Sequence, residues 1–230
     1  MIQQQLHIES LGISRGERVL VKPFNASLKA GALVILTGAN GSGKSTLLRT
    51  LVGLRSEASG DIRFNNQNIN AISAMDKAQL IAFSNSKKID DEYIRVIDLV
   101  RLGRYPYLRV FKAGNEDETL IERSMKSMGI THISHKFLNQ ISDGELQKAS
   151  IVRAFVQDTP FLMFDEPSAF LDYPSKKALF ETLRHMALEH NKIILCATHD
   201  IELAAMYGTE FWHIADQVLN ISAQQKAWLP

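Results

Sequence analysis

The segment Gly38–Thr46 reads Gly-Ala-Asn-Gly-Ser-Gly-Lys-Ser-Thr and fits the pattern of a phosphate-binding loop, G-x-x-x-x-G-K-[ST]. Its glycines permit positive φ angles, so that successive backbone N–H groups can surround an anion. Lys44 offers a cation to the β- and γ-phosphates, and the Ser45 hydroxyl is a ligand for Mg²⁺. The loop therefore predicts nucleotide binding by Gly38, Ala39, Asn40, Gly41, Ser42, Gly43, Lys44, Ser45 and Thr46.

Two acids and a histidine could complete the chemistry of phosphoryl transfer. The apolar run Phe161–Phe164 ends at Asp165 and Glu166, and the apolar run Lys192–Ala197 is followed closely by His199. We expect Asp165 to hold Mg²⁺ through its water shell and Glu166 to accept a proton from the attacking water. His199 could hydrogen-bond the γ-phosphate. Alone, an acidic turn or a core histidine would explain these residues, but beside a phosphate loop the catalytic interpretation is favoured.

A strand and a helix must hold the phosphate loop in place. Ala32–Thr37 is a short apolar run typical of a buried strand, and Lys44–Leu54 carries leucines at helical spacing. This order directs the bound phosphates toward a helix N-terminus, where the helix dipole favours anions. Open α/β sheets bind ligands at the carboxyl ends of their strands, which is where Asp165 and His199 would lie.

The remaining pattern predicts strands around this core and helices in the middle of the chain. Strands clustered on both sides of the phosphate loop predict a small antiparallel sheet beside a parallel one. The predicted strands lie near Leu6 and Ile8, at Val19–Val21, Asn25–Lys29, Asp61–Phe64 and Ile81–Ser84, and weakly at Gln217–Ile221. Helices are predicted at Arg95–Leu102, from Glu116–Glu118 to about Met128, from Ile141–Lys148 to about Val156, and at Ser175–Glu189. Lys112–Glu118 is expected to be a charged loop, and Asp200 to cap a further helix.

Composition excludes several classes of protein. The 230 residues carry a net charge of +1 without a long basic run, which argues against a nucleic-acid partner. Met1–Glu9 lacks the features of a signal peptide, and no apolar run reaches the about 20 residues that a membrane helix needs. The single cysteine, Cys196, lies in an apolar run and is expected in the core. These features indicate a cytoplasmic protein.

The phosphate loop (Walker A), Ser142–Gln147, Phe161–Glu166 and His199, in this order, resemble an ABC ATPase over nearly the whole chain. The resemblance implies an α/β fold with a P-loop NTPase core of ABC ATPase type, an antiparallel β subdomain and an inserted helical subdomain. Residues 1–230 would form one such domain, with the core at 1–85 and 150–230 and the helical subdomain at 86–149. The ligands implied are ATP and Mg²⁺.

The same resemblance implies a head-to-tail homodimer with two ATP molecules at its interface. In it, Ser142 and the Gly144 N–H of one subunit meet the γ-phosphate bound by the other. Ala169–Asp172 resembles the D-loop, which crosses that interface. Val96–Pro106 resembles the importers of iron-siderophores, haem and cobalamin. This finer likeness implies membrane-spanning permeases, a periplasmic substrate-binding protein as an indirect partner, and a place on the inner face of the cell membrane.

Three positions depart from the family pattern. The Q-loop glutamine would fall at Asn85 or Ser86, and Asn85 could still offer an amide to Mg²⁺. Asp143 stands where a glycine is usual. Its carboxylate would face the triphosphate, or else point outward and cap the following helix. Arg15 occupies the place of the adenine-stacking aromatic, and a guanidinium can stack on a base.

The residues and the resemblance predict an active ATPase of a bacterial importer for an iron chelate (siderophore or haem) or cobalamin, with catalysis assigned to Lys44, Glu166 and His199. One alternative is an ABC ATPase outside transport that clamps nucleic acid or protein. The other is a subunit that binds ATP but hydrolyses it weakly, which the departures at Asn85 and Asp143 motivate. The rate of ATP turnover separates this last alternative from the first interpretation.

Overall fold

The computed structural model describes residues 4–54, 58–85, 93–107 and 115–223. Within them, a six-stranded sheet runs in the order β10-β9-β3-β8-β7-β6, parallel except for β10. Its strands are β3 (Leu33–Gly38), β6 (Ile81–Asn85), β7 (Phe161–Asp165), β8 (Ile193–Ala197), β9 (Glu210–Ala215) and β10 (Val218–Ser222). All residues of β7 and β8 are buried, as expected of central strands covered on both faces. The predicted strands at the phosphate loop and the acidic pair are therefore confirmed.

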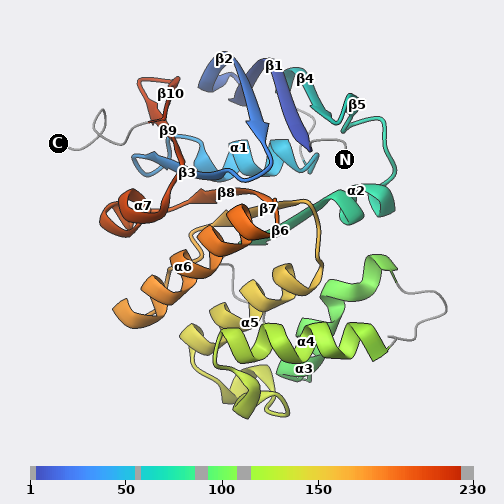
Figure 1. Cartoon of the computed structure of the whole chain (residues 1–230). Helices are drawn as coiled ribbons and strands as arrows, with labels where there is room; N and C mark the ends of the chain where they lie inside the picture. Colours follow the sequence, from blue (N-terminus) through green and yellow to red (C-terminus); the bar gives the residue numbers. More distant parts are fainter. Residues whose placement is uncertain (1–3, 55–57, 86–92, 108–114, 224–230) are drawn as a thin grey trace.

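A second, antiparallel sheet has the order β2-β1-β4-β5. Its strands are β1 (Gln5–Arg15), β2 (Arg18–Lys29), β4 (Ala58–Phe64) and β5 (Gln67–Asn68). Helix α1 (Lys44–Leu51) lies between the two sheets (Figure 1), and its leucines share a buried cluster with both. The expectation of an antiparallel sheet beside a parallel core is confirmed.

The N-terminal sheet differs from prediction at β2. The strands expected at Val19–Val21 and Asn25–Lys29 form one continuous strand. In the pairing with β1, Val21 faces Ile13 and Phe24 faces Leu11, so Lys22 and Pro23 sit at a register shift. Proline has no N–H to donate and is tolerated at such a bulge, which is why it does not end the strand.

The helices of the middle segment are α2 (Ala74–Leu80), α3 (Val96–Arg101), a 3-10 helix η1 (Leu102–Tyr107), α4 (Asn115–Ser127), the short 3-10 turns η2 (Thr131–Ile133) and η3 (Leu138–Gln140), and α5 (Asp143–Val156). In Figure 1, α3, α4 and α5 lie below the parallel sheet, whereas α2 lies beside it. Helix α4 buries Ile121 and Met125, and Met128, directly after the helix, is also buried. The helix predicted at Arg95–Leu102 ends as an α-helix at Arg101, and the chain continues as the 3-10 helix η1 with Pro106 inside it.

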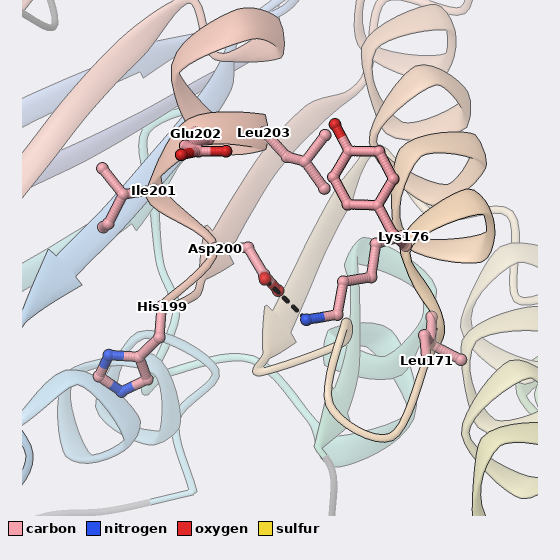
Figure 2. Close-up of a pocket in the computed structure, with 8 residues that line it drawn as sticks. Leu171, Lys176, His199, Asp200, Ile201, Glu202 and Leu203 are labelled. Atoms are coloured by element: carbon pink, nitrogen blue, oxygen red, sulfur yellow. Dashed lines mark hydrogen bonds and ion pairs between the residues drawn. The ribbon is translucent and has the colours of Figure 1, made fainter.

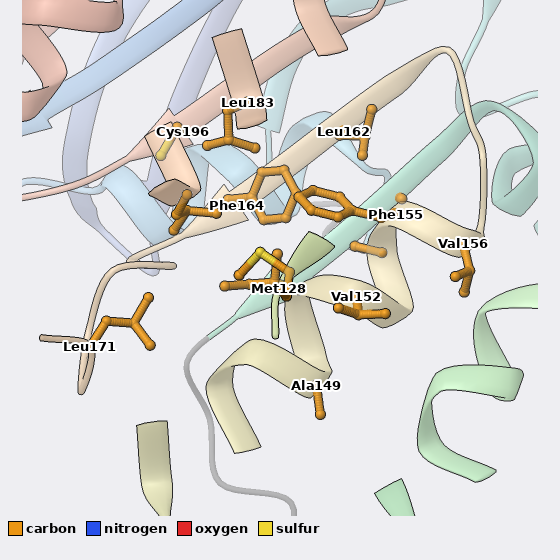
Figure 3. Close-up of a cluster of buried hydrophobic side chains, with 14 of the residues drawn as sticks. Met128, Ala149, Val152, Phe155, Val156, Leu162, Phe164, Leu171, Leu183 and Cys196 are labelled. Carbon is orange, nitrogen blue, oxygen red and sulfur yellow. The ribbon is translucent and has the colours of Figure 1, made fainter. Parts of the chain in front are cut away.

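The core of this half joins the helices to the sheet. Figure 3 shows Phe155 of α5 against Phe164 of β7. The two rings pack edge to face, with 6.0 Å between their centroids. Cys196 is fully buried in the same cluster, and burial raises the pKa of its thiol, so the expectation of a core cysteine is confirmed. Helix α6 (Tyr173–Glu189) adds Leu183 to this cluster.

Several boundaries differ from the predictions. Helix α4 begins at Asn115, inside the expected Lys112–Glu118 loop, whose first three residues lie outside the described ranges. Helix α1 ends at Leu51, short of Leu54, because Gly53 takes a positive φ of 69°. Helix α2 and strand β9 were not predicted.

Asp200 precedes helix α7 (Ile201–Tyr207), but its side chain makes no capping hydrogen bond, so the predicted cap is wrong. The carboxylate bonds instead to Lys176 Nζ at 2.7 Å. The division into residues 1–85 with 150–230 and residues 86–149 stays a prediction; α5 runs across its second boundary. No helix in the described ranges has the length and apolarity needed to cross a bilayer.

Candidate functional site

The phosphate loop connects the end of β3 to the start of α1. Gly38 has φ 147°, and a Cβ there would lie 2.7 Å from the Ile214 carbonyl oxygen, so only glycine fits. Gly43 has φ 110° and occupies the N-cap position of α1 without a side-chain cap. The backbone N–H groups of the first turn of α1 consequently need partners from outside the helix, which an anion can supply.

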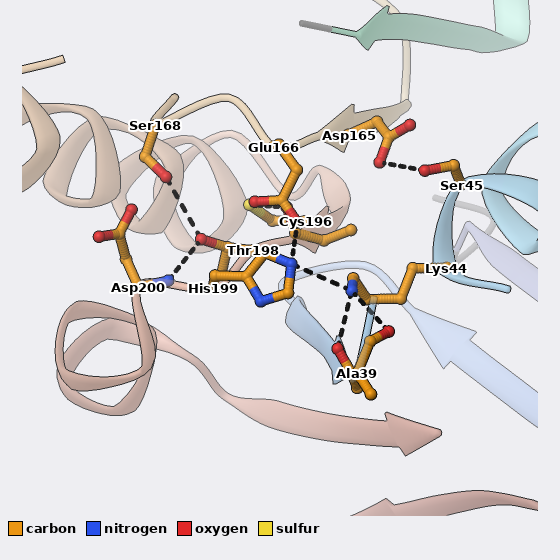
Figure 4. A network of polar contacts seen from close by, with 12 residues as sticks. Ala39, Lys44, Ser45, Asp165, Glu166, Ser168, Cys196, Thr198, His199 and Asp200 are labelled. Carbon is orange, nitrogen blue, oxygen red and sulfur yellow. Dashed lines mark hydrogen bonds and ion pairs between the residues drawn. The ribbon is translucent and has the colours of Figure 1, made fainter. Parts of the chain in front are cut away.

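Lys44 extends across the loop. Its Nζ donates to the Gly38 carbonyl at 2.8 Å and the Ala39 carbonyl at 3.3 Å, and lies 3.2 Å from His199 Nε2 (Figure 4). Burial lowers the pKa of Lys44, while the charges of Glu166 and Asp165 act in the opposite direction. The side chain is a cation held at the point where the loop and the carboxyl ends of the strands meet.

Asp165 and Ser45 form the oxygen-rich part of the site. Ser45 Oγ donates to Asp165 Oδ1 at 2.9 Å, joining α1 to the end of β7. Asn85 is paired in register with Asp165 on β6, so its backbone lies alongside. Ser86, the other candidate for the Q-loop position, lies outside the described residues. Among described residues, no group of three or more His, Cys, Asp and Glu could hold a metal.

Glu166 takes a left-handed conformation, φ 55°, directly after β7. Its N–H donates to the Ala197 carbonyl at 2.9 Å, and its Oε1 lies 3.2 Å from His199 Nε2. That contact lacks hydrogen-bond geometry, so Oε1 is a buried acceptor without a hydrogen bond from any described residue. Burial raises the pKa of Glu166, against the lowering influence of His199 and Lys44. A carboxylate in this state is suited to accepting a proton.

Lys44, Ser45, Glu166 and His199 line one cleft of about 570 Å³, and Gly38, Asn85 and Asp165 are not among its lining residues. The cleft brings together the predicted Arg15, Lys44, Glu166 and His199. Its full lining is Arg15, Arg18, Leu20, Asn40, Gly41, Gly43, Lys44, Ser45, Thr46, Glu166, Ala169, Phe170 and His199. Ala39 and Ser42 line a neighbouring hollow, which shares Asn40 and Gly41 with the cleft.

Ser142 and Gly144 do not line this cleft. Ser142 is the N-cap of α5: its Oγ accepts from the Glu145 N–H at 3.2 Å, and Glu145 Oε2 accepts from the Ser142 N–H at 2.8 Å. These hydrogen bonds lower the pKa of Glu145. The proposed cap role of Asp143 is therefore wrong, because Asp143 is the first helical residue and the capping box is formed by Ser142 before it and Glu145 after it.

Sequence reasoning did not assign four lining residues of the cleft to the nucleotide site: Arg18, Leu20, Ala169 and Phe170. Arg18 pairs with Arg15 across the β1–β2 turn, a signal that a hairpin prediction through Gly16 could have supplied. Phe170 is 65% exposed with φ 63°, and it sits in the segment already singled out at Ala169–Asp172. His213 Nδ1 lies 2.8 Å from Thr37 Oγ1, and burial lowers the pKa of His213.

Comparisons with known proteins agree with this geometry. Residues 21–169 match the family described as ABC transporter. The chain is 31% identical over 226 residues to the petrobactin import ATP-binding protein FpuD of Bacillus anthracis, covering 98% of this chain and 82% of that protein. It is 30% identical over 204 residues to the iron(3+)-hydroxamate import ATP-binding protein FhuC of Bacillus subtilis, covering 88% and 76%.

Among solved structures, the chain is similar to a dimeric bacterial ABC transporter cassette, with a TM-score of 0.83 and 22% identity. That match covers 95% of this chain and 98% of the other. The shared arrangement is the cassette fold, in which a mostly parallel sheet is combined with an antiparallel sheet and a helical region.

Proposed function

The chain belongs to the ABC transporter family, whose ATP-binding subunits hydrolyse ATP to drive transport, and we propose that it energises the import of an iron chelate. One observation carries the assignment of ATP hydrolysis: Lys44, Glu166 and His199 meet beside the phosphate loop in a single cleft. The chelate class is supported by the relatives, of which one is named for petrobactin import and one for iron(3+)-hydroxamate import.

In the proposed reaction, water attacks the γ-phosphorus of ATP, the bond to the β,γ-bridging oxygen breaks, and ADP and phosphate leave. Glu166 accepts the proton of the attacking water, because Oε1 is a buried acceptor without a hydrogen bond from the described residues. Lys44 exchanges its carbonyl partners for phosphate oxygens, and His199 donates a ring N–H to the γ-phosphate. Arg15, at the edge of the same cleft, stacks on the base.

We propose that Ser45 and Asp165 hold Mg²⁺, with the Asn85 amide as a further ligand. The Ser45 hydroxyl and the Asp165 carboxylate are already 2.9 Å apart, and both are oxygen ligands of the kind that Mg²⁺ prefers. In nucleotide sites Mg²⁺ commonly binds such side chains and the substrate phosphates at the same time. When bound, Mg²⁺ neutralises charge on the triphosphate.

We propose a homodimer as the active form, because each cleft lacks the start of α5. Ser142 and Gly144 of one subunit would approach the phosphates held by Lys44 of the other. The exposed Phe170, which lines the cleft, would lie at the interface.

Mixing two inactive chains tests this arrangement. Lys44→Ala removes the phosphate cation, and Ser142→Arg blocks the opposing surface. A mixed dimer has one composite site with both residues intact and one with both defects. ATP-dependent dimers detected by sedimentation in the mixture, but in neither variant alone, are the expected result. Dimer formation by either variant alone at the wild-type ATP concentration contradicts the proposal.

We further propose that residues 86–149 form a helical subdomain, and that permeases dock between it and the core, placing the chain on the inner face of the cell membrane. A periplasmic substrate-binding protein would act on the same permeases. Uptake assays test the substrate class: cells carrying Glu166→Gln in place of the wild-type chain should lose uptake of ⁵⁵Fe-labelled ferric siderophore and keep that of labelled cobalamin. Loss of cobalamin uptake alone would reassign the substrate, and unchanged uptake of both would reject an import role for either.

A further inference from the structure

His199 lies in a short segment between β8 and α7 whose backbone is fixed by hydrogen bonds. The Thr198 N–H donates to the Leu36 carbonyl at 3.2 Å, and the Ile201 N–H donates to the His199 carbonyl at 2.9 Å. The His199 ring itself is 52% exposed and reaches Lys44 and Glu166 at 3.2 Å each. Its position therefore depends on how the surrounding backbone is fixed.

A polar network continues from this segment toward α6. Thr198 is fully buried; its Oγ1 accepts from the Asp200 N–H at 3.0 Å and lies 3.3 Å from Ser168 Oγ (Figure 4). Asp200 Oδ1 then accepts from Lys176 Nζ at 2.7 Å, so the chain of contacts ends on the first turns of α6. Ser168 and Lys176 thereby contact Thr198 and Asp200, the residues on both sides of His199.

The Lys176–Asp200 pair lines a further hollow of about 450 Å³, distinct from the nucleotide cleft (Figure 2). Both side chains are only 26% exposed, and Tyr173 and Glu202 line the same hollow. His199 lines this hollow as well as the nucleotide cleft, so the two cavities share this residue.

We propose that Lys176 and Asp200 are positioning residues for the reaction: their ion pair ties the His199 segment to α6 and so sets where the His199 ring stands between Lys44 and Glu166. The inference rests on the proposed roles of Glu166 and His199. Helix α6 starts directly after Ala169–Asp172, with Asp172 as its cap, accepting from the Ser175 N–H at 2.9 Å. A displacement of Ala169–Asp172 would therefore move the start of α6 and, through the Lys176–Asp200 ion pair, the segment that carries His199.

Helix α6 also provides a matched control. Lys177, the next residue, pairs with Glu181 at 3.9 Å, and both side chains are about half exposed. An exposed pair of this kind contributes little to stability. Lys177→Ala therefore removes the same charge from the same helix without touching the His199 segment.

Steady-state ATP hydrolysis by the full-length chain tests the proposal. Lys176→Ala should lower kcat on the order of 10-fold to 100-fold, the cost of misplacing a reacting group by about an ångström, and change KM for ATP less than about 2-fold. Lys176→Arg, which keeps the ion pair, should recover most of the loss, and Lys177→Ala should match wild type. The proposal is overturned if Lys176→Ala and Lys177→Ala have the same kcat, whether both match wild type or both are reduced by the same factor.

Asp200→Asn supplies an independent arm with the same side-chain size. It should reproduce the kcat loss of Lys176→Ala, and the double variant should be no slower than either single one, because both remove one contact. Losses that multiply in the double variant contradict a shared role. If the wild-type chain does not hydrolyse ATP, the proposed function fails; if it does and these variants match it, only the positioning role fails.

A spectroscopic readout separates positioning from general stability. With histidine labelled with ¹³C and ¹⁵N, the ring signals of His199 are assigned by their disappearance in His199→Gln. They should shift in Lys176→Ala and Asp200→Asn and stay in place in Lys177→Ala. His199 signals that do not move in Lys176→Ala overturn the proposal even if that variant is less stable.

Discussion

Ser45 and Asp165 are 120 positions apart in the chain, yet Ser45 Oγ donates a 2.9 Å hydrogen bond to Asp165 Oδ1. The contact forms because Ser45 lies in the first turn of α1, which follows β3, while Asp165 ends β7, and only β8 separates β3 from β7 in the sheet. Carboxyl ends of parallel strands meet at one edge, which brings both oxygens to the same side of the phosphate loop.

The first prediction concerns this pair. Ser45→Ala removes the hydroxyl, so the Mg²⁺ concentration needed for half-maximal ATP turnover should rise about 10-fold or more. Ser45→Thr keeps a hydroxyl at the same position and is the control, which should stay close to wild type. A titration of turnover against Mg²⁺ measures both. Identical curves for Ser45→Ala and wild type would remove Ser45 from the metal site.

The second prediction concerns Gly144. Alanine normally favours a helix over glycine by about 1 kcal/mol, but a Cβ here would lie 2.8 Å from the Phe170 carbonyl oxygen. We expect Gly144→Ala to destabilise the protein by about 1–3 kcal/mol and to slow ATP turnover, because the displaced Phe170 lines the nucleotide cleft. Urea unfolding and turnover are the measurements.

Gly129→Ala is the matched control for Gly144→Ala. Gly129 has φ 67° and no atom within 4 Å of an added Cβ, so alanine there costs only backbone strain, about 1–2 kcal/mol. Its turnover should equal wild type. A Gly144→Ala chain that is more stable than wild type and keeps full turnover would contradict the prediction, because the backbone at Phe170 would then move at no cost.

The third prediction concerns pH and Glu166. Burial raises the pKa of Glu166 in the folded protein above the ordinary 4.5, so the folded state binds this proton more tightly than the unfolded chain. The wild type therefore loses stability as pH rises through the folded-state pKa, whereas Glu166→Gln does not titrate. The melting temperature of Glu166→Gln relative to wild type should increase from below pH 4.5 to pH 8. A difference that stays constant or shrinks contradicts the burial effect.

Local patterns made the core of the site predictable. The phosphate loop and the acidic pair each follow an uninterrupted apolar strand, and parallel strands necessarily gather such ends at one edge. The position of Ser142 at the start of a helix was equally local, since the capping box with Glu145 spans four residues.

Contacts between distant segments were not predictable. Asp200 has the right type and place for a helix cap, but Lys176, 24 residues away on α6, takes its carboxylate instead. Strand β9 was missed because Glu210 and His213 interrupt its apolar pattern. Their partners explain the exception: the Trp212 indole Nε1–H donates to Glu210 Oε1 at 2.6 Å, and His213 contacts Thr37.

The most direct test of the central claim is the ATP turnover of Glu166→Gln. The amide keeps the shape of the side chain but cannot accept the proton of the attacking water. Turnover should therefore fall by about 10²-fold or more while ATP binding persists and the dimer accumulates with ATP. Glu122→Gln, on the exposed face of α4, is the control and should hydrolyse ATP like the wild type. Hydrolysis by Glu166→Gln at the rate of that control would contradict the assignment of Glu166 as the general base.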